Sequence, residues 1–288
     1  MTIFVRLLGG LGNQMFQYAA ARALAARHGT GVVWDGRAFR HYRLRPLLID
    51  RLRVTGRAAL PAEAARLAPW RREMARLAHR AGLRTRWHFE RSLAHDPGFD
   101  DLPDGTALDG YFQSARYFAA LRDRLRAEFA PRAAAAPHNA ALLAALRGGP
   151  FASLHVRRGD YAAQAATMRV HGLCSPGYYR AALARLHAAV PGARIAVFSD
   201  DIPWCRGALD LPAGTIFVEG NADAPEWDIA LMAACRHHII ANSSFSWWGA
   251  WLGGPGGLTI APDPWFDDPA LAGQGIVPED WLRLPKSA

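Results

Sequence analysis

Two adjacent arginines, Arg157 and Arg158, follow a hydrophobic segment, residues 151–156, that is typical of a buried strand. Neighbouring guanidinium groups repel each other unless an anion or a carboxylate lies between them, and each offers a planar fork of donors that suits phosphate. Gly159 can turn the chain tightly, so that Asp160 can fold back and orient one guanidinium. The alternative is a structural ion pair between Asp160 and one arginine on a surface loop. Because further polar clusters follow other predicted strands, we interpret this segment as a phosphate-binding loop.

A serine-rich turn, residues 242–246, follows another predicted strand at residues 238–241. Hydroxyl groups and free backbone N–H groups at the start of a helix form a site for anions. Ser243 or Ser244 could instead serve only as the helix cap, and both roles can hold at once. Three tryptophans with helical spacing follow, and we expect them in the core: Trp247, Trp248 and Trp251.

Two consecutive aspartates, Asp200 and Asp201, come after the predicted strand at residues 195–199. They could bind a metal, a ribose hydroxyl or a base edge, or they could only cap the next helix. No two aspartates in the sequence are spaced i, i+2, so the D-x-D pair that holds a divalent ion on a diphosphate is missing. Because paired arginines can neutralise a departing diphosphate themselves, we expect an enzyme without metal or cofactor.

A glycine-rich elbow, residues 9–13, follows the first predicted strand at residues 3–8. Gly10 and Gly12 begin a G-x-G motif, but Met15 breaks the G-x-G-x-x-G fingerprint, and no G-x-x-x-x-G-K-[ST] loop is present. The sequence therefore lacks the main signature of the dinucleotide-binding dehydrogenases and that of the P-loop enzymes. Close approach of the backbone to a ligand and tight packing of helix on strand explain these glycines equally well.

Strand and helix patterns alternate along the chain, which predicts parallel sheets covered by helices. The patterns predict helices at residues 14–28, 61–86, 114–129, 139–147, 178–190 and 226–235, and further strands at residues 31–34, 215–218 and 258–261. The Gly148-Gly149-Pro150 cluster marks the expected domain boundary. We therefore predict two Rossmann-like, doubly wound α/β domains, residues 1–149 and 150–288, facing a cleft. The clusters described above would lie at the carboxyl ends of the strands, where open sheets bind ligands.

The net charge of +9 comes from scattered arginines, because Lys286 is the only lysine. Solvated helix faces explain this pattern best, and contact with an anionic membrane surface is the next alternative. A nucleic-acid-binding protein would interleave aromatic and basic residues, whereas Trp247 and Trp248 have no arginine beside them. A carbohydrate-binding module without catalysis would not need paired arginines. We expect no nucleic-acid partner.

The three cysteines, Cys174, Cys205 and Cys235, are widely spaced and odd in number, which indicates buried thiols rather than disulfides or a zinc site. No segment approaches the ~20 apolar residues that a membrane-spanning helix needs. The N-terminus is typical of a first strand rather than of a signal peptide. We expect a cytoplasmic protein, with peripheral contact to the inner membrane face as an alternative.

Three segments of the chain resemble those of the alpha-1,2-fucosyltransferases, which form glycosyltransferase family 11. They are residues 9–19, residues 155–161 and residues 240–252, supported by residues 110–114, 198–201 and 261–266. The resemblance spans nearly the whole chain in order, and thins between about Arg51 and Arg91.

This resemblance implies a GT-B-like fold, a GDP-β-L-fucose donor and a galactose-containing acceptor, with inversion to an α-1,2 linkage and without metal. It assigns catalysis to four residues: Arg157, Arg158, Asp160 (which holds the arginines) and Asn13. It assigns donor binding to Gly12, His155, Asp200, Asp201, Asp228, Ser243, Ser244 and Phe245, with Asp228 at the guanine edge. It places Gln14 and Gln113, with Asn13, on the acceptor side.

The expected reaction is direct displacement at the anomeric carbon by an acceptor hydroxyl, while Arg157 and Arg158 stabilise the departing GDP. No carboxylate stands out as a general base, and a dissociative path with the phosphate taking the proton needs none. The alternative is a transferase of the same fold that uses another GDP- or UDP-sugar. Asp228 distinguishes these, because a carboxylate pairs with the N–H groups of guanine but not with uracil. The acceptor and the oligomeric state stay open.

Overall fold

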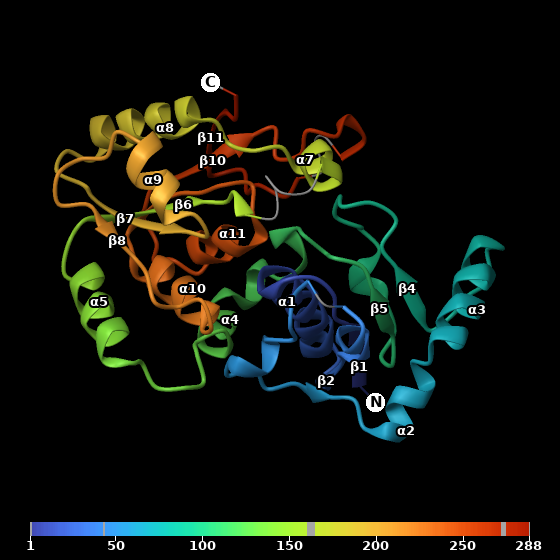
Figure 1. Ribbon diagram of the computed structural model, residues 1–288. Helices are drawn as coiled ribbons and strands as arrows, with labels where there is room; N and C mark the ends of the chain where they lie inside the picture. The colour runs from blue at the N-terminus through green and yellow to red at the C-terminus, as the bar shows by residue number, and fades with distance from the viewer. Residues whose placement is uncertain (1, 43, 160–164, 272–274, 288) are drawn as a thin grey trace. The chain divides into compact units, whose positions relative to one another are not determined.

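The computed structural model describes residues 2–42, 44–159, 165–271 and 275–287. The chain divides into two compact units, the first mainly Met1–Arg132 and the second mainly Ala133–Gly273 with Val277–Ala288. Each unit has its own parallel sheet and its own helices (Figure 1).

The first unit is built on a parallel sheet in the order β3-β2-β1-β5-β4. Its strands are β1 (Thr2–Arg6), β2 (Gly31–Asp35), β3 (Arg57–Ala58), β4 (Trp87–Phe89) and β5 (Ala107–Asp109). Helix α1 (Leu11–Arg27) is rich in alanine, the strongest helix former, and packs against β1 and β2. Alternation along β1 buries Ile3 and Val5 fully, whereas the other face of this strand is only partly covered.

Two long helices predicted for the first unit are interrupted in the structure. Residues 61–86 form α2 (Pro61–Arg66) and α3 (Pro69–Arg80), because each proline lacks an N–H group and suits the first turn of a new helix. Residues 114–129 contain two 3₁₀ turns, Ala115–Tyr117 and Ala119–Leu121, before α4 (Arg122–Glu128). Further 3₁₀ turns are Arg37–Arg40, Ile49–Arg51 and Phe99–Asp101.

The second unit has a parallel sheet in the order β11-β10-β9-β6-β7-β8. Its strands are β6 (Phe151–Val156), β7 (Arg194–Ser199), β8 (Ile216–Phe217), β9 (His237–Ile239), β10 (Thr259–Asp263) and β11 (Leu282–Pro285). The chain adds β7 and β8 on one side of β6, and then β9, β10 and β11 on the other, which is the strand order of a Rossmann fold. Every residue of the central strand β6 is buried, as expected when both faces are covered.

Helices cover both faces of this second sheet (Figure 1). They are α5 (Pro137–Arg147), α7 (Ala165–His171), α8 (Pro176–Ala189), α9 (Ile202–Ala208), α10 (Pro225–Ala234) and α11 (Ser244–Trp251), with a 3₁₀ turn at Pro269–Leu271. The predicted fold class, two Rossmann-like α/β units, is confirmed by the two parallel sheets. Trp247, Trp248 and Trp251 lie in the core, and the three cysteines are buried free thiols, as predicted.

The division between the units falls before α5, whereas the Gly148-Gly149-Pro150 cluster had suggested a boundary after it. Helix α5 packs against α10 of the second unit. Its Asn139 is buried and exchanges two hydrogen bonds with Asn221, at 2.8 and 3.1 Å. These contacts join α5 to the second unit, and local composition cannot reveal them.

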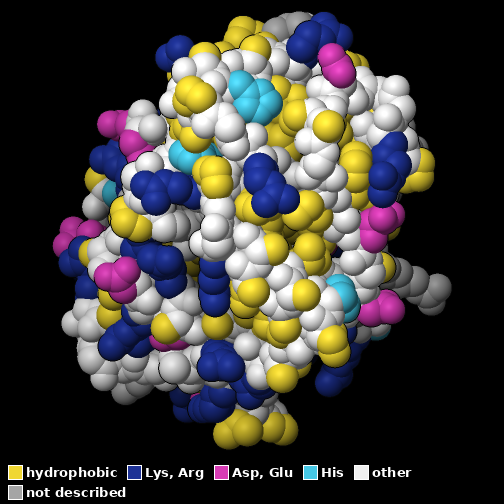
Figure 2. All heavy atoms as spheres, turned by 90° about the vertical axis from the view of Figure 1, so that its left-hand side faces the viewer, with side chains coloured by type: hydrophobic (Ala, Val, Ile, Leu, Met, Phe, Trp, Pro, Cys, Tyr) yellow, Lys and Arg dark blue, Asp and Glu magenta, His cyan; other side chains and the backbone are white. Residues whose placement is uncertain are grey.

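Basic side chains are spread over the face shown in Figure 2 among acidic and apolar ones, in keeping with the scattered arginines of the sequence. Over residues 2–42, 44–159, 165–271 and 275–287, the structure contains no helix with the length and apolarity to cross a membrane.

Candidate functional site

The polar clusters predicted for the second unit follow three neighbouring strands of its sheet. The order β9-β6-β7 brings the carboxyl ends of these strands side by side. Arg157 and Arg158 follow β6, Asp200 and Asp201 follow β7, and the serine turn follows β9. The sheet order reverses between β6 and β9, and open α/β sheets bind ligands at such a point. The arginine loop and the serine turn therefore lie on the two sides of the position where a ligand is expected.

Asp200 holds the arginine loop in place. Its carboxylate accepts a hydrogen bond from the backbone N–H of Arg158 at 2.9 Å, and it pairs with the Arg157 guanidinium at 2.8 Å. Gly159 is required beside it, because a Cβ at this position would come within 2.5 Å of a carboxylate oxygen of Asp200. Asp200 therefore stabilises the conformation of the arginine loop.

Arg158 lies between an aromatic ring and a carboxylate. Its guanidinium stacks over the ring of Trp204 at 4.1 Å, and Asp201 Oδ2 is 3.5 Å from its Nε. That Nε is buried, and within the described part of the chain it has no hydrogen-bond partner. Asp201 also caps α9 by accepting from the Trp204 backbone N–H at 3.1 Å. Stacking fixes the guanidinium plane, which orients its donors for an incoming anion.

His155 is buried near the end of β6, and its ring centroid lies 5.8 Å from that of Phe245. Burial lowers the pKa of His155 to about 3; the charge of Asp200 opposes this shift and that of Arg157 adds to it. The imidazole is therefore neutral near neutral pH. It can donate one hydrogen bond to a diphosphate but contributes no charge, so that the positive charge of the loop belongs to the arginines.

The serine turn forms the start of α11. Ser243 caps the helix by accepting from the Phe245 backbone N–H at 3.3 Å, and Ser244 is the first helical residue. The ring contact between Phe245 and His155 brings this turn against the end of β6. The capping role and an anion-binding role remain compatible, because a cap satisfies only part of the N–H groups at a helix start.

Asp228 lies in the first turn of α10, which packs against α11. Burial raises the pKa of Asp228 to about 6, the hydrogen bond from Asn221 lowers it, and the charge of Glu226 raises it further. The Asn221 amide donates to this carboxylate at 2.8 Å and is held in turn by Asn139 of α5. A carboxylate whose pKa is raised by burial, and whose orientation is fixed by a hydrogen bond, is common at ligand-binding sites.

In the first unit, two predicted residues meet beside the central strands of the sheet. Asn13 Oδ1 accepts a hydrogen bond from Gln113 Nε2 at 2.8 Å. They come from the segments that follow β1 and β5, neighbouring strands between which this sheet order also reverses. Gly9 has a φ of 77°, and a Cβ there would lie 2.5 Å from the Asn13 amide, so the elbow needs glycine to admit Asn13.

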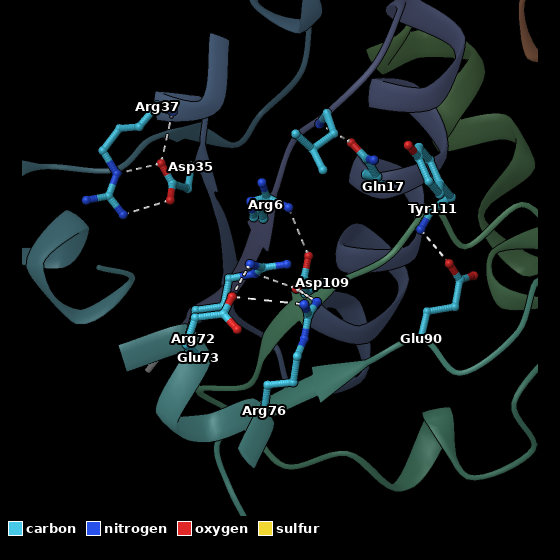
Figure 3. A network of polar contacts seen from close by, with 11 residues as sticks. Arg6, Gln17, Asp35, Arg37, Arg72, Glu73, Arg76, Glu90, Asp109 and Tyr111 are labelled. Atoms are coloured by element: carbon cyan, nitrogen blue, oxygen red, sulfur yellow. Dashed lines mark hydrogen bonds and ion pairs between the residues drawn. The ribbon is translucent and has the colours of Figure 1, made fainter. Parts of the chain in front are cut away.

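The segment that carries Gln113 is held by Glu90 (Figure 3). The Glu90 carboxylate accepts from the backbone N–H groups of Tyr111 at 2.6 Å and of Phe112 at 2.8 Å. Burial raises the pKa of Glu90, and these two hydrogen bonds oppose that shift. Phe112 has a φ of 53°, an unusual value for a residue other than glycine, and its side chain is fully buried. The anchored backbone sets where Gln113 lies.

Gln14 is placed differently from the expectation that it faces the acceptor. Its side chain is fully buried, and all four hydrogen-bonding positions of its amide are used. Nε2 donates to the carbonyls of Gly9 and Pro46, and Oε1 accepts from the N–H groups of Leu48 and Ile49. Gln14 therefore joins the elbow to the segment at residues 46–49 and leaves no polar atom for a sugar.

Replacing Gln14 by alanine is expected to lower the free energy of unfolding by about 2–4 kcal/mol, since buried backbone groups lose their partners. Gln17→Ala is the matched control, because Gln17 is also fully buried on α1 but, among the described residues, makes one hydrogen bond, which its Oε1 accepts from the Leu8 N–H at 2.9 Å. Urea unfolding of both variants measures the difference. Equal losses would contradict the bridging role of Gln14.

The family model for glycosyl transferase family 11 matches residues 101–284, more than half of the chain. The chain belongs to this family. The family 11 protein is also 32% identical to an alpha-1,2-colitosyltransferase from Escherichia coli, over 99% of this chain and 99% of that enzyme.

A second relative is a galactoside alpha-(1,2)-fucosyltransferase 1 from Saimiri sciureus, which is 32% identical over 85% of this chain. The chain spans 64% of the length of that enzyme. One solved structure that is similar to this chain is that of the NodZ alpha-1,6-fucosyltransferase soaked with GDP-fucose. The two chains are 14% identical, with a TM-score of 0.49, and the match covers 94% of this chain and 97% of the other.

The roles predicted for the individual site residues of the family 11 protein stay predictions. Asp160, which was expected to hold the arginines, lies outside the described residues; the carboxylates that the structure places on Arg157 and Arg158 are those of Asp200 and Asp201. Gly12 lies buried in the first turn of α1. The described residues contain no cluster of three or more His, Cys, Asp or Glu side chains arranged for a metal ion.

Sequence reasoning missed residues that position the candidate side chains of each unit: Trp204, Asn139 and Asn221 in the second unit, and Glu90 in the first. Trp204 could have been suspected, because it lies three residues after Asp201 at a helix start. Asn139 and Asn221 are 82 positions apart, and only the fold brings them together. Glu90 lies where the family resemblance thins, so no motif marked it.

Proposed function

We propose that this family 11 glycosyltransferase transfers L-fucose from GDP-β-L-fucose to the 2-hydroxyl of a galactose-containing glycan, with inversion and without a metal ion. The observation that carries the proposal is the meeting of an arginine pair and a serine-lined helix start at the central strands β6 and β9. Cationic forks and helix N–H groups are both suited to a diphosphate.

In the proposed mechanism the acceptor hydroxyl attacks the anomeric carbon while the bond to GDP breaks. Arg157 and Arg158 stabilise the negative charge that grows on the β-phosphate. The stacking of the Arg158 guanidinium on Trp204 at 4.1 Å supports this role, since it fixes the plane of the donors. Neutral His155 adds a hydrogen bond at most. The proton of the attacking hydroxyl passes to the departing phosphate, so that no protein base is invoked.

The recognition of guanine is assigned to the Asp228 carboxylate. When ionised, it accepts hydrogen bonds from guanine N1–H and N2–H, and a uracil base offers no such pair of donors. Its anchoring by Asn221 at 2.8 Å supports this assignment, because a fixed carboxylate loses little freedom when a base binds. In the first unit, Asn13 and Gln113 are the candidates for contact with the sugars.

A second candidate donor is the GDP derivative of colitose, which is L-fucose without its 3-hydroxyl group. It is favoured by the relative named an alpha-1,2-colitosyltransferase, which matches this chain over nearly its full length. Both donors share the guanine and the diphosphate, and the difference concerns only the contacts of one sugar hydroxyl.

A donor screen with a galactoside panel and linkage analysis tests the proposal. We expect GDP-fucose to give an α-1,2-linked product with kcat/KM at least about tenfold above that of GDP-colitose, because a site built for the hydroxyl leaves polar groups unpaired when it is missing. UDP-sugars should be inactive, and a chelator should not change the rate. A preference for GDP-colitose would favour the second candidate, and turnover of UDP-sugars would exclude guanine recognition.

A further inference from the structure

Helix α3 binds the first sheet with its charged side chains. Arg72 Nε and Arg76 Nη2 contact Asp109 Oδ2 at 2.6 and 3.2 Å, and Arg6 reaches the same carboxylate from β1 at 3.3 Å. Asp109 is buried at the end of β5, and Figure 3 shows the arginines of α3 and β1 pointing toward it. The Arg76 guanidinium also lies 5.1 Å above the ring of Phe89. The helix is thus attached through ion pairs.

The opposite side of α3 carries its large apolar side chains. Trp70, Met74 and Leu77 have the spacing i, i+4, i+7 and so share one face, here named the apolar ridge. They are 62%, 61% and 57% exposed, and no residue of α3 is buried. A surface helix ordinarily buries such a face and exposes its charges. The reversed orientation indicates that the ridge contacts a hydrophobic partner.

The surroundings of the ridge are strongly basic. Residues 61–86 contain seven arginines against two glutamates. Arg72 and Arg76 contact Asp109, and the Arg71 guanidinium lies 4.7 Å from the Trp70 ring centroid. Five arginines of this segment are exposed: Arg66, Arg71, Arg80, Arg84 and Arg86. An apolar stripe bordered by cations matches a surface that is both apolar and anionic.

A cavity of about 960 Å³ adjoins this element. Trp70, Met74 and Arg71 line it together with Phe4 and Trp87. It opens at the amino ends of β1 and β5, so it lies at the opposite edge of the sheet from the elbow and the Gln113 segment. It is therefore not part of the candidate site, and it extends the apolar and basic surface.

We propose that α2 and α3 dock the protein on an anionic lipid membrane, with the apolar ridge inserted at the level of the headgroups and the surrounding arginines on lipid phosphates. Helices of this kind lie in the interface, held by apolar area and by attraction to anionic lipids. A second copy of the chain fits less well, since a symmetric contact would bring two strongly basic faces together. The proposal is independent of the sugar that is transferred.

Co-sedimentation of the full chain with vesicles tests this inference without any activity measurement. We expect binding to phosphatidylcholine mixed with phosphatidylglycerol, and little binding to phosphatidylcholine alone or at high salt. Combining Trp70→Ser, Met74→Ser and Leu77→Ser should lower the partition coefficient at least about tenfold. Combining Arg71→Gln and Arg80→Gln should lower it about 30-fold, from two lost attractions to the anionic surface.

The control combines Leu44→Ser and Met168→Ser, which remove exposed apolar side chains (62% and 39%) outside the ridge, and it should bind like the wild type. Because all these side chains are exposed, the variants should keep the wild-type melting temperature. Wild-type protein that stays in the supernatant, or a ridge variant that binds as tightly, would overturn the proposal. So would a wild-type dimer in sedimentation that the ridge variant converts to a monomer, since the ridge would then be covered by a second copy.

Discussion

Arg158→Ala is expected to lower kcat by about 100- to 1000-fold, the usual loss when one preorganised donor to a developing oxyanion is removed. The guanidinium is held by the ring of Trp204 at 4.1 Å, and its Nε has no hydrogen-bond partner among the described residues. Its contact with Asp201 is long, at 3.5 Å, so the guanidinium keeps most of its charge for the departing phosphate. Steady-state kinetics with saturating donor and acceptor measures the loss, and circular dichroism checks the fold.

Arg157→Ala should also reduce turnover. A larger part of its effect should come from weaker donor binding than from a slower chemical step. Arg157 pairs with Asp200 at 2.8 Å, and Asp200 also holds the loop through the Arg158 N–H. Removing Arg157 changes the charge around Asp200 as well as the charge offered to the diphosphate. We therefore expect higher KM for the donor together with lower kcat.

Arg206→Ala is the matched control for both arginine variants. Arg206 also pairs with a carboxylate, Glu219 at 3.3 Å, and stacks over an aromatic ring, Phe217 at 3.8 Å, but its side chain is 52% exposed. We expect Arg206→Ala to lose a similar ion pair and a similar ring contact but to keep its activity. That result would show that the losses in the other two variants come from the reaction and not from reduced stability. Near wild-type kcat in both Arg157→Ala and Arg158→Ala would contradict their action on the leaving group.

Asp228→Asn is expected to weaken GDP binding by about 10- to 100-fold near neutral pH, the loss of charge-assisted hydrogen bonds to a base. Binding of UDP should change little, because uracil does not offer the same donors. Calorimetric titration with GDP and with UDP measures both. Asp210→Asn, an equivalent change at an exposed aspartate, is the control. Unchanged GDP affinity in Asp228→Asn would exclude Asp228 from guanine recognition.

The pH dependence of GDP binding follows from the same residue. Burial raises the pKa of Asp228 to about 6, and only the ionised form accepts from guanine. GDP affinity of the wild type should therefore be full above about pH 7 and fall as the pH decreases through about 6. Asp228→Asn should lack this part of the decline. A wild-type affinity that is constant from about pH 7 to 5 would contradict the assignment.

Asp228→Asn should have a higher free energy of unfolding than the wild type. The carboxyl pKa in the fold, about 6, lies above its ordinary value of 3.8, so burial of the charge destabilises the native state. At about 1.4 kcal/mol per unit of pKa, the difference approaches 3 kcal/mol, and we expect a gain of about 1–3 kcal/mol above pH 6. This advantage should shrink as the pH falls through about 6 and be absent below about pH 4, where the wild-type carboxyl is neutral in both the folded and the unfolded state.

Sequence patterns predicted β6 with the bounds that the structure has, and β7, α5, α8 and α10 within two residues. These elements are helices of ten residues or more, or strands that are mainly apolar, so that period and propensity agree. The pattern failed for β3, β4 and β5, which have two or three residues each and show no alternation. It also failed at Pro69, where a helical pattern continued through a proline that begins a new helix.

For the candidate site, too, the sequence predicted some features correctly and others not. Arg157, Arg158, Asp200 and the serine turn were identified from the sequence, because unusual polar residues directly after buried strands have few structural uses. Gln14 shows the limit of that reasoning. It lies in a recognisable motif, but its amide is used by backbone groups at residues 46–49, which the motif does not contain.

The amino-acid sequence by itself determined the alternation of strands and helices, the chemical types of the residues at strand ends and the resemblance to family 11. These depend on local period and on motifs a few residues long. Only the tertiary structure decided that Asp200 holds the arginine loop, that Asn139 and Asn221 orient Asp228, and that α3 turns its arginines inward. Each of these depends on side chains that are tens of residues apart in the chain. Such contacts follow from the order of strands in a sheet, which local periodicity does not contain.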